Sequence, residues 1–88
     1  MTAGAHQRLD KWLWHARVVR TRTSASALVD GGLVRINGVR TTQAAHAVKI
    51  GDVLTIALNA RVRVLRVEGL APRRGDATAA SALYAELT

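Results

Sequence analysis

The side chains best suited to chemistry in this 88-residue chain are cations, and they cluster in its first half. Residues 1–40 hold seven Lys and Arg against two Asp, a net charge of +5, whereas residues 41–88 carry a net charge of +2. Eleven of the thirteen cations are arginine, whose planar guanidinium matches a phosphate through parallel hydrogen bonds. This distribution indicates a polyanionic partner, most commonly nucleic acid.

Patterns for catalysis or metal binding are weak by comparison. His6, His15 and His46 have no cysteine beside them and no His-x-x-x-His spacing, which argues against a metal site. A Ser-His-Asp triad around His15 would lack the nucleophile elbow and the Gly-rich oxyanion loop that accompany such triads. We therefore expect no enzyme activity, no catalytic residue, no metal and no cofactor.

Short helices would have to position the cations. In the first, the apolar side chains fall on one arc at about 100° per residue: Leu9, Trp12, Leu13 and Ala16. Thr21 or Thr23 can cap a second helix, which should end in a left-handed cap at Gly31-Gly32. The start of that helix would offer free backbone N–H groups to a phosphate.

Asp10 and Trp14 lie off the apolar arc, on the flank that carries Arg17. We expect Asp10 to orient Arg17 or Trp14, or to favour the helix start through the macrodipole. Two interpretations of Trp14 remain open. The ring is either half-exposed beneath an arginine stem or a stacking platform for an unpaired base.

The rest of the chain should complete a small sheet and end in a helix. Asn37-Gly38 predicts a type I′ turn, because both of its positions need positive φ. We expect a return strand at 39–41, a surface loop at 42–48, and strands at 53–58 and 61–67. The alternation of the last strand slips at Leu65, which a bulge or burial of both faces would explain. Asp76 or Thr78 can cap a final helix with an apolar stripe formed by Ala80, Leu83, Tyr84 and Leu87.

These elements predict an α+β fold, with two helices packed on a small, twisted, mostly antiparallel sheet plus a C-terminal helix. The first residues contain no apolar signal segment. The longest apolar stretch, 53–58, is far below the roughly 20 residues that span a bilayer. We therefore expect a cytoplasmic protein with no membrane partner.

Several motifs resemble the S-four RNA-binding domain, also called the alpha-L motif. They are Arg8-Leu9-Asp10-Lys11, Thr21-Arg22-Thr23 with Ala25, Gly32 to Gly38, and Lys49-Ile50-Gly51-Asp52. Within this superfamily the chain is similar to the bacterial heat-shock protein fifteen family. That similarity lies in Lys11-Trp12-Leu13-Trp14, Arg73-Arg74-Gly75 and Ala82-Leu83-Tyr84.

The resemblance implies a flexible N-terminus at 1–7, an RNA-binding domain at 8–70, and a basic connector with a C-terminal helix packed on the domain at 71–88. It also implies docking on ribosomal RNA of large ribosomal subunits that still carry a stalled nascent chain on tRNA. Unlike better-known members, the chain ends soon after Tyr84, which makes its length similar to that of the short S-four proteins of ribosome-associated quality control. Recycling of the subunit and tailing of the stalled peptide both stay open. We expect a monomer whose partners are ribosomal RNA, the ribosome and, in one version, tRNA.

We expect RNA contacts from the cations of the first half and their neighbours: Arg8, Lys11, Trp14, Arg17, Arg20, Arg22, Thr23, Arg35, Asn37, Gly38, Arg40 and Lys49. Arg61, Arg63 and Arg66 alternate on a strand and would either contact RNA or solvate the sheet. Two other functions remain open. One is an RNA-targeting accessory of an RNA-modifying enzyme, such as a pseudouridine synthase or a methyltransferase. The other is a protein-interaction module that uses the C-terminal helix.

Overall fold

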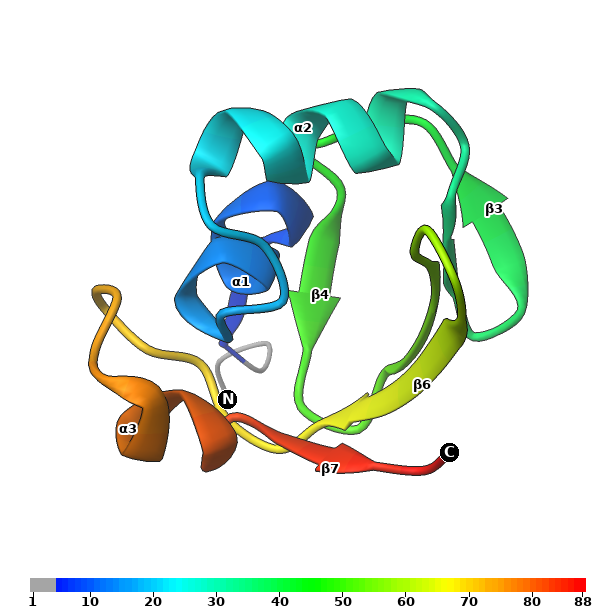
Figure 1. Cartoon of the computed structure of the whole chain (residues 1–88). Helices are drawn as coiled ribbons and strands as arrows, with labels where there is room; N and C mark the ends of the chain where they lie inside the picture. The colour runs from blue at the N-terminus through cyan, green and yellow to red at the C-terminus, as the bar shows by residue number, and fades with distance from the viewer. Residues whose placement is uncertain (1–4) are drawn as a thin grey trace.

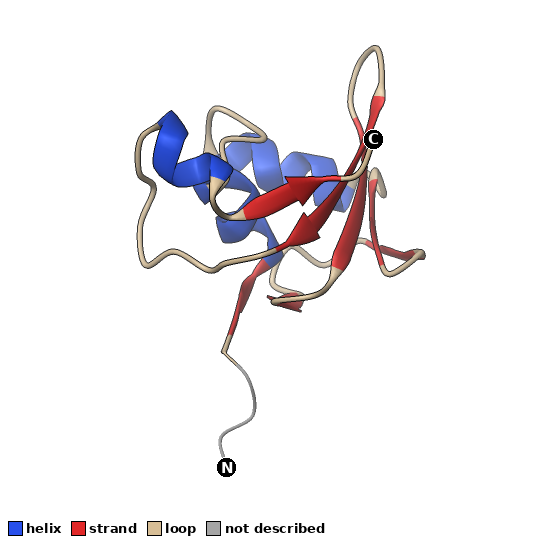
Figure 2. Ribbon diagram, turned by 90° about the horizontal axis from the view of Figure 1, so that it is seen from below, coloured by secondary structure: helices blue, strands red, loops and turns tan. Residues whose placement is uncertain are grey.

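Two helices lie against a curved antiparallel sheet in the computed structural model, which describes residues 5–88 (Figure 1). The five-stranded sheet has the order β3-β2-β5-β6-β7, and β1 pairs separately with β4. The helices gather on one side of the sheet (Figure 2). This is the α+β architecture that the sequence predicts. The elements are β1 (His6–Arg8), α1 (Leu9–His15), α2 (Arg22–Asp30), β2 (Val34–Ile36), β3 (Val39–Thr41), β4 (Ala47–Lys49), β5 (Val53–Ala57), β6 (Val62–Val67), α3 (Ala77–Ser81) and β7 (Tyr84–Glu86).

The core lies between α1, α2 and the inner face of the sheet. Its fully buried side chains include Leu9, Trp12, Leu13, Ala25, Val29, Val34, Val48, Leu54, Ile56, Leu65 and Val67. Trp12, which the sequence places on the apolar arc of the first helix, thus lies in the core. Its indole N–H donates to the Gly69 carbonyl at 2.9 Å, and its ring meets Tyr84 edge-to-face at 6.5 Å. Burying an indole with its one donor satisfied avoids the cost of an unpaired polar group.

The predicted helix and turn signals are present. Thr21 caps α2, because its side-chain oxygen accepts a hydrogen bond from the Ser24 N–H at 3.0 Å. Gly32 adopts the left-handed conformation after α2, with φ of 74°. Asn37 and Gly38 have φ of 51° and 83°, as a type I′ turn between β2 and β3 requires. Within residues 5–88, none of the helices combines the length and the hydropathy that a membrane span requires.

Two segments that the sequence predicts to be irregular form a small sheet instead. The sequence predicts a surface loop at 42–48, yet Ala47 and Val48 lie in β4, which pairs antiparallel with β1. His6 and Gln7, assigned to a flexible N-terminus, lie in β1, and residues 1–4 lie outside the described part of the chain. The pairing places Val48 in the core at 0% exposure, which supplies the burial that stabilises so short a ladder.

The C-terminal helix is shorter than its predicted apolar stripe. Asp76 caps α3 by accepting from the Ala79 N–H at 2.8 Å, but α3 ends at Ser81 and Tyr84 begins β7. Leu87 is 47% exposed, so it is no part of a buried helical face. The helix ends early because the residues after it form β7, which pairs with the edge of β6. This pairing satisfies backbone groups of β6 that would otherwise have no partner.

The bulge predicted near Leu65 is absent. β5 and β6 pair without interruption, from Val53 opposite Arg66 to Ala57 opposite Val62. Leu65 is buried and Arg66 is exposed, so only one face of the strand enters the core. The alternation seemed to slip because Arg63 shares the inward side with Leu65.

Candidate nucleic-acid interface

Asp10 connects the strand before α1 to the start of α2. Its side chain is almost fully buried, at 3% exposure. Arg8 donates to it through Nε and Nη2, both at 3.1 Å, and the Arg22 Nε lies 3.6 Å from Oδ2. We call Asp10 with these two arginines the Asp10 cluster. The prediction that Asp10 orients Arg17 or Trp14 is therefore wrong, although Asp10 does lie in the first turn of α1.

The Asp10 carboxylate is ionised at neutral pH. Burial acts to raise the pKa of Asp10, but the hydrogen bonds from Arg8, from the Lys11 backbone N–H and from the Ser26 hydroxyl outweigh it, and the pKa falls below the usual 3.8. The two arginine side chains remain 51% and 43% exposed. One buried negative charge thus holds two guanidinium groups near each other while leaving part of each open to a ligand.

The other end of α1 carries Trp14 and Arg17. Trp14 is half-buried, and the Arg74 guanidinium lies over its ring at 5.9 Å from the centroid. This arginine comes from the connector at residues 71–76, before α3, and not from α1 itself. Sequence reasoning assigned no role at the interface to Arg74, because 60 residues separate it from Trp14. The sequence marks this part of the interface only by two adjacent arginines, Arg73 and Arg74, in a connector of small residues.

Arg20 and Thr23 lie in the link to α2 and in its first turn, and both are exposed. Thr21 already uses one of the backbone N–H groups expected to be free there, that of Ser24. We call the seven predicted residues on this side the helical surface: Arg8, Lys11, Trp14, Arg17, Arg20, Arg22 and Thr23.

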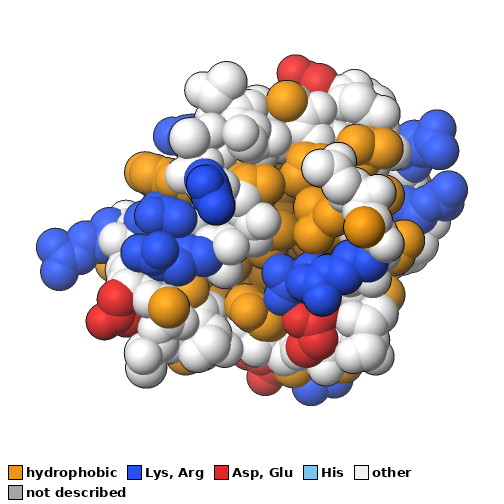
Figure 3. Space-filling view, in the orientation of Figure 1, with side chains coloured by type: hydrophobic (Ala, Val, Ile, Leu, Met, Phe, Trp, Pro, Cys, Tyr) orange, Lys and Arg blue, Asp and Glu red, His pale blue; other side chains and the backbone are white. Residues whose placement is uncertain are grey.

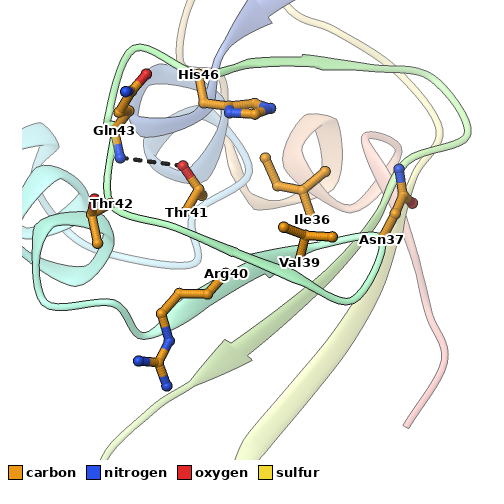
Figure 4. Close-up of a pocket in the computed structure, with 8 residues that line it drawn as sticks. All are labelled: Ile36, Asn37, Val39, Arg40, Thr41, Thr42, Gln43 and His46. Atoms are coloured by element: carbon orange, nitrogen blue, oxygen red, sulfur yellow. Dashed lines mark hydrogen bonds between the residues drawn. The ribbon is translucent and has the colours of Figure 1, made fainter.

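The hairpin carries the other predicted contacts. Arg35 lies directly opposite Arg40 in the β2–β3 register, and within residues 5–88 neither has an acidic partner. Like charges opposite each other in a ladder are destabilising, so the charges of this pair do not stabilise the hairpin. Arg40 extends from one side of an open hollow of about 680 Å³ between the hairpin and the loop before β4 (Figure 4).

Asn37 and Lys49 converge on Asp52. Asn37 donates to Asp52 at 3.1 Å and accepts from the Val53 N–H at 2.9 Å, and the Lys49 Nζ lies 3.1 Å from the same carboxylate. Burial acts to raise the pKa of Asp52, but hydrogen bonds from the Lys49 backbone N–H, the Asn37 amide and the Lys49 ammonium hold it below the usual 3.8. The side chain of Asn37 therefore fixes the hairpin against β5. We call Arg35, Asn37, Gly38, Arg40 and Lys49 the hairpin surface.

Lys and Arg side chains form several separate groups on the face that Figure 3 draws. Some lie at the left and others at the right, on the side of the hairpin, and a further group lies right of centre directly above acidic side chains, with apolar side chains between the groups. Of the strand arginines, Arg63 pairs with Glu86 at 2.6 Å and Arg66 pairs with Glu68. Residues 5–88 contain no group of three or more His, Cys, Asp or Glu placed to hold a metal ion.

Comparisons with known proteins identify the family of the chain. The S4 domain family model matches residues 7–54. Heat shock protein 15 of Escherichia coli (strain K12) is 37% identical over 79 residues, which cover 90% of this chain and 59% of that protein. The RQC P-site tRNA stabilizing factor of Listeria innocua is 35% identical over 63 residues, 72% of this chain and 67% of that protein.

A solved structure shares the fold. The trimeric structure of Vibrio cholerae heat shock protein 15 aligns with a TM-score of 0.87 and 36% identity, covering 93% of this chain and 82% of that one. The present chain spans about 59% of the length of the curated heat shock protein 15 that it matches. With a family model matching more than half of its residues and a solved relative on the same fold, the chain belongs to the S4 domain family, and heat shock protein 15 is among its homologues.

Proposed function

We propose that this protein binds structured ribosomal RNA of the large ribosomal subunit through the helical surface and the hairpin surface. The observation that carries the proposal is the Asp10 cluster, in which one carboxylate orients Arg8 and Arg22 while both remain about half exposed. A guanidinium held in place before binding loses less side-chain freedom when it meets a phosphate. The cluster therefore suits the docking of a phosphate backbone.

The mode of recognition is shape and phosphate spacing rather than base sequence. The helical surface contributes five cations, and the hairpin surface adds Arg35 and Arg40. Double-stranded RNA hides its base edges in a deep, narrow groove, so proteins recognise it through its backbone and its 2′-hydroxyls. Asn37 and Gly38 serve this mode by shaping the turn that carries the hairpin arginines.

The RNA target is a large subunit that carries a stalled nascent chain on tRNA, in the cytoplasm. The name of the Listeria relative refers to a P-site tRNA, and the E. coli relative is a heat shock protein, which together support a role under conditions that stall translation. We infer that one chain is sufficient for binding. Because the Vibrio relative was solved as a trimer, light scattering of the protein alone and with RNA is the check on this point.

The decisive test compares two charge reversals. Arg20 and Arg61 are both exposed and have no ion pair within the described residues, so Arg20→Glu and Arg61→Glu change the net charge equally and leave packing intact. We expect Arg20→Glu to lose co-sedimentation with large subunits that carry peptidyl-tRNA, and Arg61→Glu to retain it, at unchanged melting temperatures. The reverse result would move the interface to the sheet and remove the proposal.

The accessory alternative makes a different prediction. If the protein delivers an RNA-modifying enzyme, that enzyme should co-purify with it instead of ribosomal proteins, and crosslinked RNA should map to a modified nucleotide. The protein-interaction alternative relied on a C-terminal helix that presents Leu83 and Tyr84, whereas Leu83 is only 8% exposed and Tyr84 lies in a strand.

A further inference from the structure

Both helices of the pair end in the same backbone motif, but different residues occupy its left-handed position. After α2, the Gly32 N–H bonds to the Val29 carbonyl at 2.9 Å and the next N–H bonds to the Leu28 carbonyl at 3.1 Å. This is a Schellman cap, whose left-handed residue is usually glycine. After α1 the same two bonds form, yet the left-handed residue is Arg17, with φ of 59°.

An arginine in this conformation is strained, and the fold offers glycine at the equivalent place after α2. Non-glycine residues with positive φ are uncommon, and those that persist often lie at functional sites. Unlike glycine, Arg17 brings a guanidinium group to this position. The position therefore points to a use for the Arg17 side chain beyond capping.

The Arg17 side chain takes part in a reciprocal pair of hydrogen bonds with the connector. Arg17 donates through Nε to the Gly75 carbonyl at 3.0 Å, and Arg74 donates through Nε to the Trp14 carbonyl at 3.1 Å. Each bond uses one of the five N–H donors of a guanidinium. No other hydrogen bond of either guanidinium occurs within residues 5–88, so both groups are oriented and both keep their terminal donors for a ligand.

Three side chains of β1 and α1 also hold the connector in place. Gln7 and His15 both bond to the Ala71 carbonyl, at 2.8 and 3.0 Å, and Trp12 bonds to the Gly69 carbonyl. Because a carbonyl only accepts, the proton of neutral His15 lies on Nδ1. The path of the connector past the end of α1 (Figure 1) is thus fixed, and so is the position of Arg74 beside Trp14.

Trp14 completes the arrangement with an aromatic surface in a cationic setting. Its ring is half-buried and has the Arg74 guanidinium 5.9 Å from its centroid. The nearest acid of α1, Asp10, is engaged by Arg8. Aromatic rings interleaved with arginines are the usual way in which proteins hold unpaired nucleotides, through base stacking together with phosphate contacts.

We propose that Trp14, Arg17 and Arg74 bind one unpaired nucleotide of the RNA, with the base stacked on the indole beside Arg74 and its phosphate bound by the terminal N–H groups of Arg17 and Arg74. This site rests on the proposed RNA binding and adds to it a ligand class, an unstacked nucleotide, that backbone docking does not need.

The test uses two RNA probes of equal length, a single-stranded adenine oligonucleotide and a fully paired duplex. Stacking should quench Trp14 fluorescence with the single strand and not with the duplex, while buried Trp12 should not respond. Trp14→Leu should abolish the quenching and lower single-strand affinity about ten-fold, and Trp14→Phe, which keeps a ring, should retain most of that affinity. Duplex affinity should change less than two-fold in both variants.

A second variant separates function from folding. Arg17→Gly should lower single-strand affinity while leaving the melting temperature nearly equal, since glycine accepts positive φ without strain and this relief offsets the loss of the exposed hydrogen bond to the Gly75 carbonyl. Arg61→Gln removes the same positive charge from the turn between β5 and β6. It should change single-strand affinity less than two-fold relative to the wild-type protein.

The outcomes distinguish this proposal from the one on which it rests. Wild-type protein that binds neither probe would remove the RNA-binding function itself. If both probes bind, but Trp14→Leu and Arg17→Gly keep single-strand affinity, or the duplex quenches equally, the nucleotide site is wrong and backbone docking stands.

Discussion

At the scale of single residues, Asp10 separates two explanations of RNA affinity. If affinity follows net charge alone, removing an acid from a chain of charge +7 should strengthen binding. If affinity depends on the orientation of Arg8 and Arg22, removing the carboxylate that holds them should weaken it. Asp10→Asn keeps the side-chain shape but loses the ionic hydrogen bonds, so we expect weaker RNA binding together with a stability loss of about 1.5–3 kcal/mol.

Asp30 supplies the matched control for this prediction. It is exposed at the end of α2 and has no ion pair within the described residues, so Asp30→Asn makes the same charge change without disturbing an arginine. We expect its RNA affinity to be equal or slightly higher at an unchanged melting temperature. Titrations of both variants with one ribosomal RNA fragment decide the matter, and tighter binding by Asp10→Asn would favour the simple charge account.

His15 predicts how stability depends on pH. Burial lowers the pKa of His15 below the usual 6.5, and Lys11, Arg22 and Arg74 lower it further, against the opposing bond to the Ala71 carbonyl. His15 therefore becomes protonated at a higher pH in the unfolded chain than in the folded chain. The free energy of unfolding should fall as the pH drops below about 6.5. The pKa values of Asp10 and Asp52 are lowered from 3.8, so their contribution is lost only at a more acidic pH.

The two pH windows can be resolved by measuring melting temperature from pH 8 to pH 3. His15→Gln, which can still donate to the Ala71 carbonyl, should remove the decline that begins near pH 6.5 and leave the acidic one. If the melting temperature of His15→Gln still declines from about pH 6.5 downward, another group titrates in that pH range.

At the scale of elements, the hairpin tests whether backbone conformation controls RNA binding. Gly38 has φ of 83° and open space around a Cβ built on it, so Gly38→Val would be penalised by its backbone angle and not by a clash. We expect a loss of about 1–3 kcal/mol together with reduced RNA affinity, because the turn carries Arg35 and Arg40. Gly38→Asn, which tolerates positive φ, should keep most of both properties, and unchanged melting of the valine variant would contradict the turn's role.

The elements that the sequence predicts well are those set by local signals. The apolar arc of α1, the Thr21 cap and the Asn37-Gly38 turn each depend on residues within a few positions of one another. The short strands β1, β4 and β7 were missed, because three residues carry no usable period and their pairing joins segments far apart in the chain. Such ladders are stabilised by tertiary burial, which a local pattern does not contain.

The same division applies to the candidate site. The cations of the helical surface follow from composition and helical spacing, and their contacts with RNA remain predictions. The partners of Asp10 could not be predicted, because Arg22 reaches it from another helix. The position of Arg74 on Trp14 likewise depends on the path of the connector.

At the scale of the whole molecule, the C-terminal segment is part of the same folded unit as the S4 match. β7 covers the edge of β6, Leu83 joins the core, and Arg63 lies over Tyr84 while pairing with Glu86. The Arg63–Glu86 hydrogen bond is the main cause that raises the pKa of Arg63 and lowers that of Glu86. Two of the three strand arginines are thus used in ion pairs, whereas within the described residues Lys11, Arg17 and Arg20 of the helical surface and Arg35 and Arg40 of the hairpin surface have none.

That distribution predicts the salt dependence of the whole interface. If the five cations of the helical surface each neutralise one phosphate, the slope of log affinity against log salt should lie near −3.5 to −4.5, from about 0.7–0.9 per contact. Arg20→Gln should reduce the magnitude of this slope by about one contact. Arg61→Gln, in the turn between β5 and β6, should leave the slope unchanged. Binding to a ribosomal RNA fragment measured between 50 and 300 mM salt gives all three slopes, and a wild-type slope near zero would exclude electrostatic docking as the basis of RNA binding.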